Sequence, residues 1–360
     1  MRLDARHVAF VLAVVAFGCG SRGQPSTSTA NTSAAGLCCE STGAAVPGSS
    51  GNTRPAATPA YDITRLMYGV PLDLDEEGNI LLQPASDRGA ILLHADGVRV
   101  DRLPHDLTIG RLSGGGEVAV GSTSDSAGIT AVLFDGVWTD LNTLLCGSSE
   151  CWANNEAIGI DAGGRIVGNR YSLSTGLSAY TISPNGIVST LVFPGATSTG
   201  VCDVNSRGEI LVHAVFSNSA YERAVIVSTS GEPIGITIPN GHVWANSINE
   251  RSHVAGCTQA AGVSHPFIWA EGKLTDLGSI GPRYGEKFSC GVSISDEDVV
   301  VGDSSAPTIR GSTHFVYANG TMFDLDAISG IELDYVVRIN AKGQILARDS
   351  FGYVVLLKPR

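Results

Sequence analysis

The sequence predicts an all-β protein, a seven-bladed β-propeller with four-stranded antiparallel blades, which follows a disordered N-terminal tether. Three observations carry this prediction. The composition is rich in turn-forming residues, with 44 Gly and 15 Pro beside 43% hydrophobic and only 16% charged residues. Apolar residues alternate with a period of two in short segments. A turn signal also returns about every 44 residues along the chain.

A four-residue turn is the clearest marker of the repeat. It begins with Asp, Asn or Ser, whose side chains start turns by bonding to the backbone two residues on, and its fourth residue is most often Gly, which accepts a positive φ. The seven turns occupy residues 75–78, 113–116, 161–164, 205–208, 249–252, 295–298 and 340–343. Their first residues are 38, 48, 44, 44, 46 and 45 positions apart, so seven units fill residues 61–360.

Strands of alternating pattern flank these turns, such as 157–160 before the third turn and 165–168 after it. A hairpin follows, and several units have Asp-Gly or Asn-Gly at its tip, as at Asp96-Gly97 and Asn319-Gly320. Four antiparallel strands per repeat are typical of a propeller blade. One four-stranded sheet cannot bury both of its faces, so it must stack on its neighbours.

The last unit lacks a fourth strand. Its first three strands are expected at 335–339, 344–348 and 353–358, and the chain ends at Arg360. Residues 61–68 precede the first unit and have no blade of their own. We therefore expect 61–68 to pair antiparallel with 353–358 as the missing outer strand. This pairing would close the propeller of residues 61–360 and remove an exposed edge.

The N-terminus has the layout of a secretory signal peptide, residues 1–18. Arg2 and Arg6 precede an apolar run at 8–17, which is too short to span a bilayer because a spanning helix needs about 20 residues. Residues 16–18 resemble the lipobox of bacterial lipoproteins, which implies cleavage after Gly18 and a lipid anchor on Cys19. The alternatives are an ordinary secretory signal or a buried thiol at Cys19.

Residues 19–60 are predicted to form a disordered tether. Of the 41 residues at 20–60, 33 are Gly, Ser, Thr, Pro, Ala or Asn, so there is little apolar surface to bury. Such a chain spans roughly 35 Å, enough to hold a folded domain clear of lipid headgroups. The N-terminal region therefore predicts an exported lipoprotein of the cell envelope, anchored by the lipid on Cys19 in the outer membrane or at the cell surface.

One part of the repeat resembles a known family. The segments that carry the resemblance are 247–249, 254–256, 265–269 and 272–278, with an echo at 313–315 and a fair match at 138–141. They resemble the bacterial extracellular HAF repeat, named for a His-Ala-Phe tripeptide, although Pro266 stands where the family has Ala. The resemblance implies export and a propeller-like fold, and it brings no known reaction. His265 and His314 are therefore interpreted as structural residues packed where their strands begin.

Charge and motifs exclude several classes of function. Lys and Arg number 23 against 35 Asp and Glu, a formal net charge of −12, and no basic run occurs, so no nucleic-acid partner is expected. The sequence has no Gly-x-Ser-x-Gly, Walker or His-Glu-x-x-His motif. The acidic segment 73–79 lacks the distal Glu of a calcium loop and is interpreted as a turn. No cofactor, metal site or catalytic residue is therefore predicted.

The eight cysteines fit an oxidising compartment, in which disulfides persist. Cys146 and Cys151 enclose four residues of a loop between blades, and a bridge between them is predicted. Cys257 and Cys290 fall in neighbouring units, where both a bridge between blades and two buried thiols are possible. The sequence leaves open the partners of five cysteines: Cys38, Cys39, Cys202, Cys257 and Cys290.

The sequence favours a non-catalytic binding or display module for a protein or a glycan. The alternative is a propeller enzyme that acts on glycans as a hydrolase or lyase. Binding residues gather on loops held by a rigid scaffold, and the long, varied connections all lie on one face of a propeller, opposite the tight turns. Exposed aromatic and Arg side chains on that face are the candidates, since such residues are common interface anchors. They are Trp152, Tyr221, Arg223, Arg283 and Tyr284.

Overall fold

The structure is a computed structural model that describes residues 58–86, 89–103, 106–113, 119–125, 128–146, 154–172, 176–217, 219–229, 232–260, 262–280, 288–305 and 312–360. Contacts divide the chain into one unit of residues 1–57 and another of residues 58–360, and the second unit contains every described residue. The predicted signal peptide 1–18, Cys19 and the predicted tether as far as residue 57 lie outside the described residues. No helix in the described part is long and apolar enough to cross a membrane.

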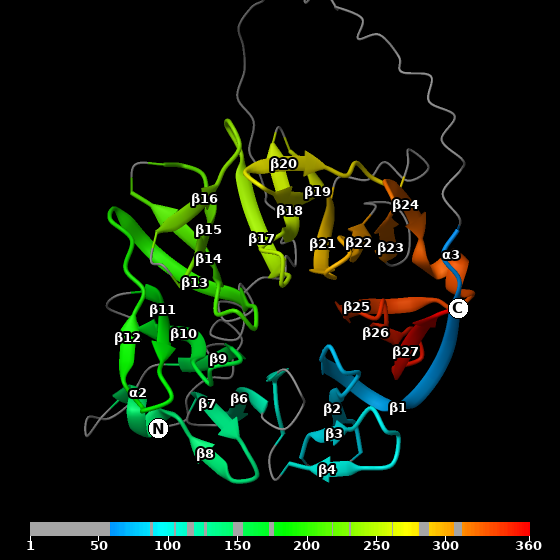
Figure 1. The fold of residues 1–360 in the computed structure, drawn as a ribbon, viewed down its shortest axis with the longest axis horizontal. Helices are drawn as coiled ribbons and strands as arrows, with labels where there is room; N and C mark the ends of the chain where they lie inside the picture. The colour runs from blue at the N-terminus through cyan, green and yellow to red at the C-terminus, as the bar shows by residue number, and fades with distance from the viewer. Residues whose placement is uncertain are drawn as a thin grey trace, which may run out of the picture. The chain divides into compact units, whose positions relative to one another are not determined.

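Seven four-stranded antiparallel sheets stand in a ring around a common axis, with the first strand of each sheet nearest the axis (Figure 1). This arrangement confirms the predicted fold class, a seven-bladed β-propeller. Each blade uses strands that follow one another in the chain. The seventh blade takes its fourth strand from the N-terminal half of β1, and a single parallel pair, Ser264 with Phe288, links the fifth sheet to the sixth.

The strands of the first four blades are, in order, β1 (Tyr61–Leu74), β2 (Ile80–Pro84), β3 (Ile91–Leu93) and β4 (Val100–Arg102); β5 (Ile109–Leu112), β6 (Ala119–Asp125), β7 (Gly128–Phe134) and β8 (Trp138–Asp140); β9 (Asn154–Ile160), β10 (Ile166–Ser172), β11 (Gly176–Ile182) and β12 (Val188–Thr190); and β13 (Ala196–Val204), β14 (Ile210–Phe216), β15 (Arg223–Val227) and β16 (Pro233–Ile236).

The strands of the last three blades are β17 (His242–Ile248), β18 (Val254–Ala260), β19 (Val263–Ala270) and β20 (Lys273–Asp276); β21 (Phe288–Ile294), β22 (Val300–Ser305), β23 (Ser312–Ala318) and β24 (Thr321–Asp324); and β25 (Leu333–Ile339), β26 (Ile345–Asp349) and β27 (Tyr353–Pro359). Two short helices, α2 (Asn142–Cys146) and α3 (Leu325–Ser329), follow the outer strands of the second and sixth blades.

The hydrophobic core lies between blades rather than inside any one of them. The cluster between the fourth and fifth blades is representative. Leu211 and Ile226 of the fourth blade are buried against Val243 and Phe267 of the fifth. Because each sheet covers its face only by stacking on the next one, the blades stabilise one another around the ring.

β1 belongs to two blades. Its first half pairs antiparallel with β27, from Tyr61 opposite Pro359 to Tyr68 opposite Tyr353, and its second half pairs with β2 in the first blade. The backbone N–H of Arg360 also donates to the carbonyl of Ala60, at 3.0 Å. The pairing that the sequence leads us to expect between 61–68 and 353–358 is therefore present, and it joins the two ends of the described chain.

A β-bulge recurs in the first strand of six blades, three residues before the first residue of the tight turn. The bulged residues are Leu72, Ile158, Cys202, Asn246, Val292 and Val337. In three blades a glycine of the second strand lies beside this bulge. A Cβ at Gly256 would stand 2.0 Å from the carbonyl oxygen of Trp244, and Gly168 and Gly302 have equally close contacts. An aromatic residue of the third strand pairs with each glycine: Tyr180, Phe267 or Phe315.

One disulfide joins neighbouring blades. Cys257 of β18 in the fifth blade is bonded to Cys290 of β21 in the sixth, and both residues are buried. Of the two possibilities that the sequence leaves open for this pair, the structure has the bridge. Cys202 is a buried thiol. Cys151 lies outside the described residues, so the Cys146–Cys151 bridge stays a prediction.

Removal of the closing strand tests the role of β1. A chain that begins at residue 69 should melt at least several degrees below one that begins at residue 58, because the seventh blade loses its fourth strand and the packing of the buried Tyr61. Thermal unfolding followed by circular dichroism measures the difference. Equal melting temperatures for the two truncations would contradict a structural role for this pairing.

Replacement of a bulge-side glycine tests the packing of the repeat. Gly256→Ala should lower the free energy of unfolding by about 1–3 kcal/mol, because the new methyl group collides with the backbone of β17. Gly235→Ala is the matched control, since no other atom lies within 4 Å of the position of its Cβ. Denaturant unfolding of both variants gives the comparison. A smaller loss for Gly256→Ala than for Gly235→Ala would refute the collision.

Candidate functional site

The two ends of the propeller differ in their connections. We call the end with the turns between first and second strands and between third and fourth strands the tight-turn face; it includes 75–78, 205–208 and 340–343. We call the other end the loop face; it carries the connections between second and third strands and between blades, such as 217–222 and 350–352. The predicted turn chemistry is confirmed on the tight-turn face, since Gly78 and Gly208 have positive φ values of 93° and 81°.

Polar groups of the tight-turn face are bonded within and between the turns. Oδ1 of Asn249 accepts the backbone N–H groups of Arg251 and His253 in its own turn, while its Nδ2 donates to the carbonyl of Ser295 in the next blade. Asn205 and Asn340 repeat the link to the following blade. Asp75 binds backbone N–H groups of its own turn, so segment 73–79 is a turn. Among the described residues, no group of acidic, His or Cys side chains could hold a metal ion.

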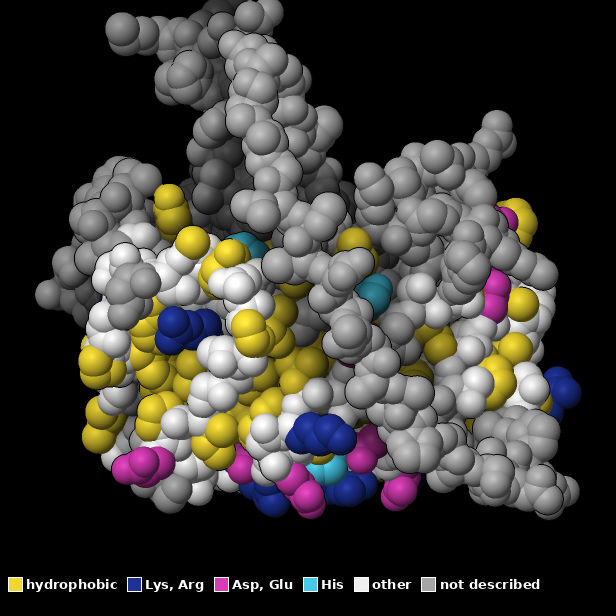
Figure 2. Space-filling model, turned by 90° about the horizontal axis from the view of Figure 1, so that it is seen from above, with side chains coloured by type: hydrophobic (Ala, Val, Ile, Leu, Met, Phe, Trp, Pro, Cys, Tyr) yellow, Lys and Arg dark blue, Asp and Glu magenta, His cyan; other side chains and the backbone are white. Residues whose placement is uncertain are grey.

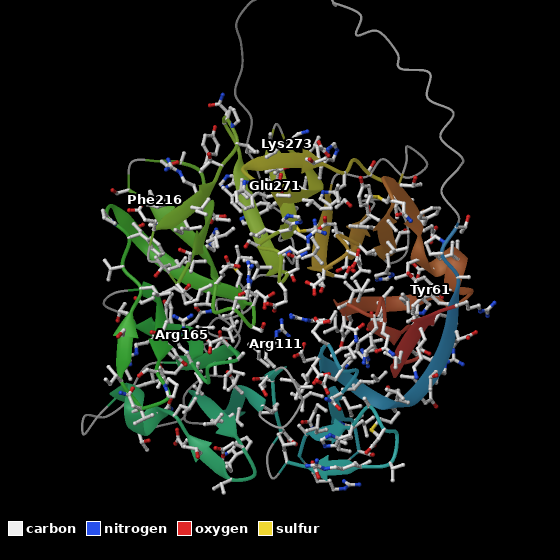
Figure 3. The ribbon with its side chains drawn as sticks, in the orientation of Figure 1. Tyr61, Arg111, Arg165, Phe216, Glu271 and Lys273 are labelled. Atoms are coloured by element: carbon white, nitrogen blue, oxygen red, sulfur yellow. A yellow bond between two sulfur atoms is a disulfide. The ribbon has the colours of Figure 1, made fainter. Side chains whose placement is uncertain are left out.

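Charged side chains meet on the axis beside a pocket of about 70 Å³ that opens among the tight turns. Arg338 of the seventh blade lies 3.7 Å from Oδ1 of Asp73 and 3.5 Å from Oδ1 of Asp203, which belong to the first and fourth blades. Burial opposes its charge, but the Asp203 and Asp73 carboxylates raise the pKa of Arg338 above its ordinary value. Arg111, at the centre of the ring in Figure 3, approaches Asp73 to 3.8 Å.

The same carboxylates bond neighbouring blades together. Asp73 accepts the backbone N–H of Leu112 at 2.8 Å, and Asp203 accepts that of Ile248 at 3.1 Å. Oγ of Ser293 accepts the N–H of Ile339 in the same way, at 3.2 Å. The polar groups around the axial pocket therefore have a structural role, and the pocket is too small for more than a few water molecules.

A cluster of aromatic and charged side chains lies on the loop face between the fourth and fifth blades. We call it the Glu222 cluster; its members are His213 of β14, Tyr221 and Glu222 just before β15, and His242 and Trp244 of β17. The indole N–H of Trp244 donates to Oε2 of Glu222. Nε2 of His213 and Nδ1 of His242 lie 3.4 Å and 3.6 Å from the same oxygen.

The rings of this cluster form a continuous wall. The imidazole of His242 stacks on the indole of Trp244 with centroids 5.4 Å apart and an angle of 19° between the planes. Tyr221 meets the imidazole of His242 edge-on, with the two ring centroids 5.4 Å apart. Tyr221 is 37% exposed, so the wall reaches the solvent.

Glu222 is fixed in place and ionised. Its backbone N–H donates to Nδ1 of His242 at 3.3 Å, and its carbonyl accepts the N–H of Val243 at 3.2 Å. The close approach of His213 is the main cause that lowers the pKa of Glu222 to about 2, burial opposes the lowering, and the Trp244 hydrogen bond adds to it. A negative charge therefore persists beside three rings at neutral pH.

A second aromatic cluster lies on the loop face where the seventh and first blades meet. We call it the Phe351 patch; it consists of Arg65, Tyr68, Phe351 and Tyr353. The rings of Tyr68, Phe351 and Tyr353 are 53%, 70% and 41% exposed. The Arg65 guanidinium lies 5.8 Å and 6.0 Å from the ring centroids of Phe351 and Tyr353, and it pairs with the buried carboxylate of Asp349 at 2.7 Å.

Three titratable side chains outside these two clusters, His314, His265 and Glu156, differ in their burial and partners. His314 is fully buried beside Asp326, at 3.0 Å, while His265 pairs with Asp276 at 2.9 Å in a more exposed position. Burial raises the pKa of Glu156, on the first strand of the third blade, to about 7. Glu156 is thus a described carboxyl group that changes charge near neutral pH.

Among the described residues, one side of the ring is mostly apolar (Figure 2). Figure 2 shows hydrophobic side chains across the side of the unit that lies at the top of Figure 1, with charged side chains mostly along the lower edge. Ile234 of the fourth blade and Val263 of the fifth are 45% and 42% exposed and belong to different blades. Single exposed apolar residues of this kind are ordinary in soluble domains.

The structure brings together only some of the candidates taken from the sequence. Tyr221 lies in the Glu222 cluster. Arg223 follows it on β15, but its guanidinium lies 4.9 Å over the ring of Phe216, outside the cluster. Trp152, Arg283 and Tyr284 lie outside the described residues.

Sequence reasoning missed the partners of Glu222 and the whole Phe351 patch. His242 and Trp244 begin the first strand of the fifth unit, so an alignment of the seven units would have marked them as loop-face positions. No comparable signal marks His213, which lies inside the second strand of its blade.

Comparison with known proteins shows the fold and no family. No protein-family model matches the sequence, and no curated protein matches it. A structure of streptogramin B lyase matches 84% of this chain and 98% of its own, with a TM-score of 0.54 at 9% identity. A catalytically inactive variant of virginiamycin B lyase from Staphylococcus aureus with quinupristin matches 83% of this chain and 99% of its own, with a TM-score of 0.50 at 9% identity. At this identity the likeness shows the β-propeller fold alone.

The stability of the protein should depend on pH through Glu222. Its folded-state pKa is depressed to about 2 from an ordinary value of 4.5, so the ionised carboxylate stabilises the fold above pH 4.5 and loses this effect as the pH falls toward 2. Glu222→Gln should therefore melt below the original protein at pH 6.5, and the gap should narrow by pH 3. A gap of unchanged size across this range would contradict the depressed pKa.

Proposed function

We propose that this protein is exported, anchored in the cell envelope through a lipid on Cys19, and acts as a non-catalytic binding module whose loop face engages a protein or a glycan. The observation that carries the proposal is the chemical difference between the two faces. The polar groups of the tight turns bond the blades to one another, whereas the loop face exposes two clusters of aromatic rings with charged partners.

The composition of the loop-face clusters supports a binding role. Tyr, Trp and Arg side chains contribute most to binding energy at protein interfaces, and they lose little conformational entropy when they are already held in place. Arg65 is held by its ion pair with Asp349, and Glu222 by three contacts with β17. Both clusters are thus arranged before any ligand arrives.

Three observations support export and the direction of the loop face. The repeat resembles the extracellular HAF repeat over residues 245–326, and the Cys257–Cys290 disulfide fits an oxidising compartment. β1 begins at Tyr61, beside the end of β27, on the tight-turn face. The propeller therefore begins at the end opposite the proposed binding face.

The electrostatics of Glu222 favour binding over acid–base chemistry. A general base works best when its pKa lies near the working pH, and the pKa of Glu222 is about 2. Glu156, with a pKa of about 7, is the observation that favours the alternative, a propeller enzyme that acts on glycans. If the protein is such an enzyme, Glu156→Gln should abolish turnover of a glycan substrate. If it is a non-catalytic binding module, the same variant should leave ligand binding unchanged.

Alanine variants of the loop face test the proposed function. Once a panel of envelope glycans and proteins yields a ligand, Phe351→Ala with Tyr68→Ala, or Tyr221→Ala, should weaken its binding by about tenfold or more, with the fold intact by circular dichroism. Val98→Ala is the control, because Val98 is 85% exposed in a tight turn. Trp152, Arg283 and Tyr284 are replaced in the same series.

Two results would count against the proposal. One is a panel in which no ligand binds the purified protein. The other is a ligand whose binding survives all the loop-face variants and is lost when the tight turns are altered. Anchoring is measured separately, as incorporation of labelled lipid that disappears in Cys19→Ala.

A further inference from the structure

We propose that the Glu222 cluster is a site for an organic cation, and that its ligand is the guanidinium or ammonium group of a basic side chain on a polypeptide partner. This inference rests on the proposed binding function and names the chemistry of one part of the loop face. It follows from three observations: one oxygen of the Glu222 carboxylate has no hydrogen-bond donor among the described residues, aromatic rings lie beside the carboxylate, and the nearby charges are placed favourably.

The carboxylate of Glu222 is used on one side only. Trp244, His213 and His242 all approach Oε2, and among the described residues no hydrogen bond reaches Oε1. The side chain is 31% exposed. A carboxylate oxygen without a donor accepts a charge-assisted hydrogen bond from a cation, which is about twice as strong as a bond between neutral groups.

The rings beside this carboxylate suit a cation as well. Tyr221, His242 and Trp244 form one wall through an edge-on and a stacked contact. The faces of Tyr and Trp attract ammonium and guanidinium groups that lie within about 6 Å of the ring centroid. A planar guanidinium could lie against the wall while one of its N–H groups points at Oε1.

Among the described residues, no Lys or Arg side chain pairs with Glu222. Ala224 and Ile226 of β15 pack into the core between the fourth and fifth blades, so the alternation of the strand turns Glu222 to the same side and Arg223 to the opposite one. The guanidinium of Arg223 accordingly lies over Phe216. The net charge of −12 also favours a basic partner over an acidic one.

The acidic side chains around the axial pocket, by contrast, already have partners. Around the axial pocket Glu250 accepts the backbone N–H of Ser206, Asp296 accepts that of Glu250, and Glu76 accepts that of Ala341. Arg338 already supplies a cation beside that pocket. Among the described residues, the Glu222 cluster is thus a place where a negative charge without a Lys or Arg partner lies beside exposed rings.

The experiment compares short capped peptides that differ in one central residue: Arg, Lys or citrulline, which has the shape of Arg without its charge. Calorimetric titration of the full-length protein should show the Arg and Lys peptides binding about tenfold more tightly than the citrulline peptide. Glu222→Gln should abolish this preference. Glu271→Gln, in the outer hairpin of the fifth blade (Figure 3), removes the same charge on the tight-turn face and should leave the preference unchanged.

The outcomes separate this inference from the proposed function. Equal binding of the Arg and citrulline peptides to the original protein, a comparison that needs no variant, would overturn the cation site, even where a ligand from the panel still binds the loop face. Tighter binding of an oligosaccharide of glucosamine than of the Arg peptide would overturn the polypeptide source. Tyr221→Ala keeps the carboxylate and should weaken the Arg peptide severalfold; circular dichroism checks that each variant is folded.

Discussion

The ring depends on the bonds that successive first strands exchange around the axis. Each blade is a single sheet with both faces apolar, so it is stable only between two neighbours, and the neighbours must be held in register. Side chains one blade back supply that register: Asp73 and Asp203 accept backbone N–H groups of the next blade, and Asn249 reaches the following turn. Arg338 then joins two of these carboxylates across the axis, so that charges buried far apart in the sequence compensate one another.

This requirement explains why the two faces differ. The tight turns lie where the first strands end, and their polar groups are consumed in holding blades together. On the opposite face the backbone also links blades, as Val243 does with Glu222, but described side chains such as Phe351 stay exposed. Glu222 has both roles: its backbone and Oε2 bond to β17 of the next blade, whereas Oε1 accepts no hydrogen bond from the described residues.

Much of the fold could be predicted because its signals are local. In four of the seven turns, an Asn or Asp that opens the turn and a Gly that closes it lie three residues apart, and two of the other three turns keep one of these two residues. The site could not be predicted in the same way. Glu222 contacts His213 in its own blade and Trp244 in the next blade. The second contact depends on how the two sheets stack. The partner of Cys257 was likewise open until the relative position of the fifth and sixth blades was known.

The strand shared by the last and first blades has a consequence for the order of folding. Its pairing joins Asp62 to the C-terminal Arg360, 298 positions away, so it is the slowest loop of the unit to close. Until β27 has been synthesised, the N-terminal half of β1 has no partner and the ring stays open. The seven blades therefore cannot form a closed ring before both halves of this pairing, residues 61–68 and 353–359, are present.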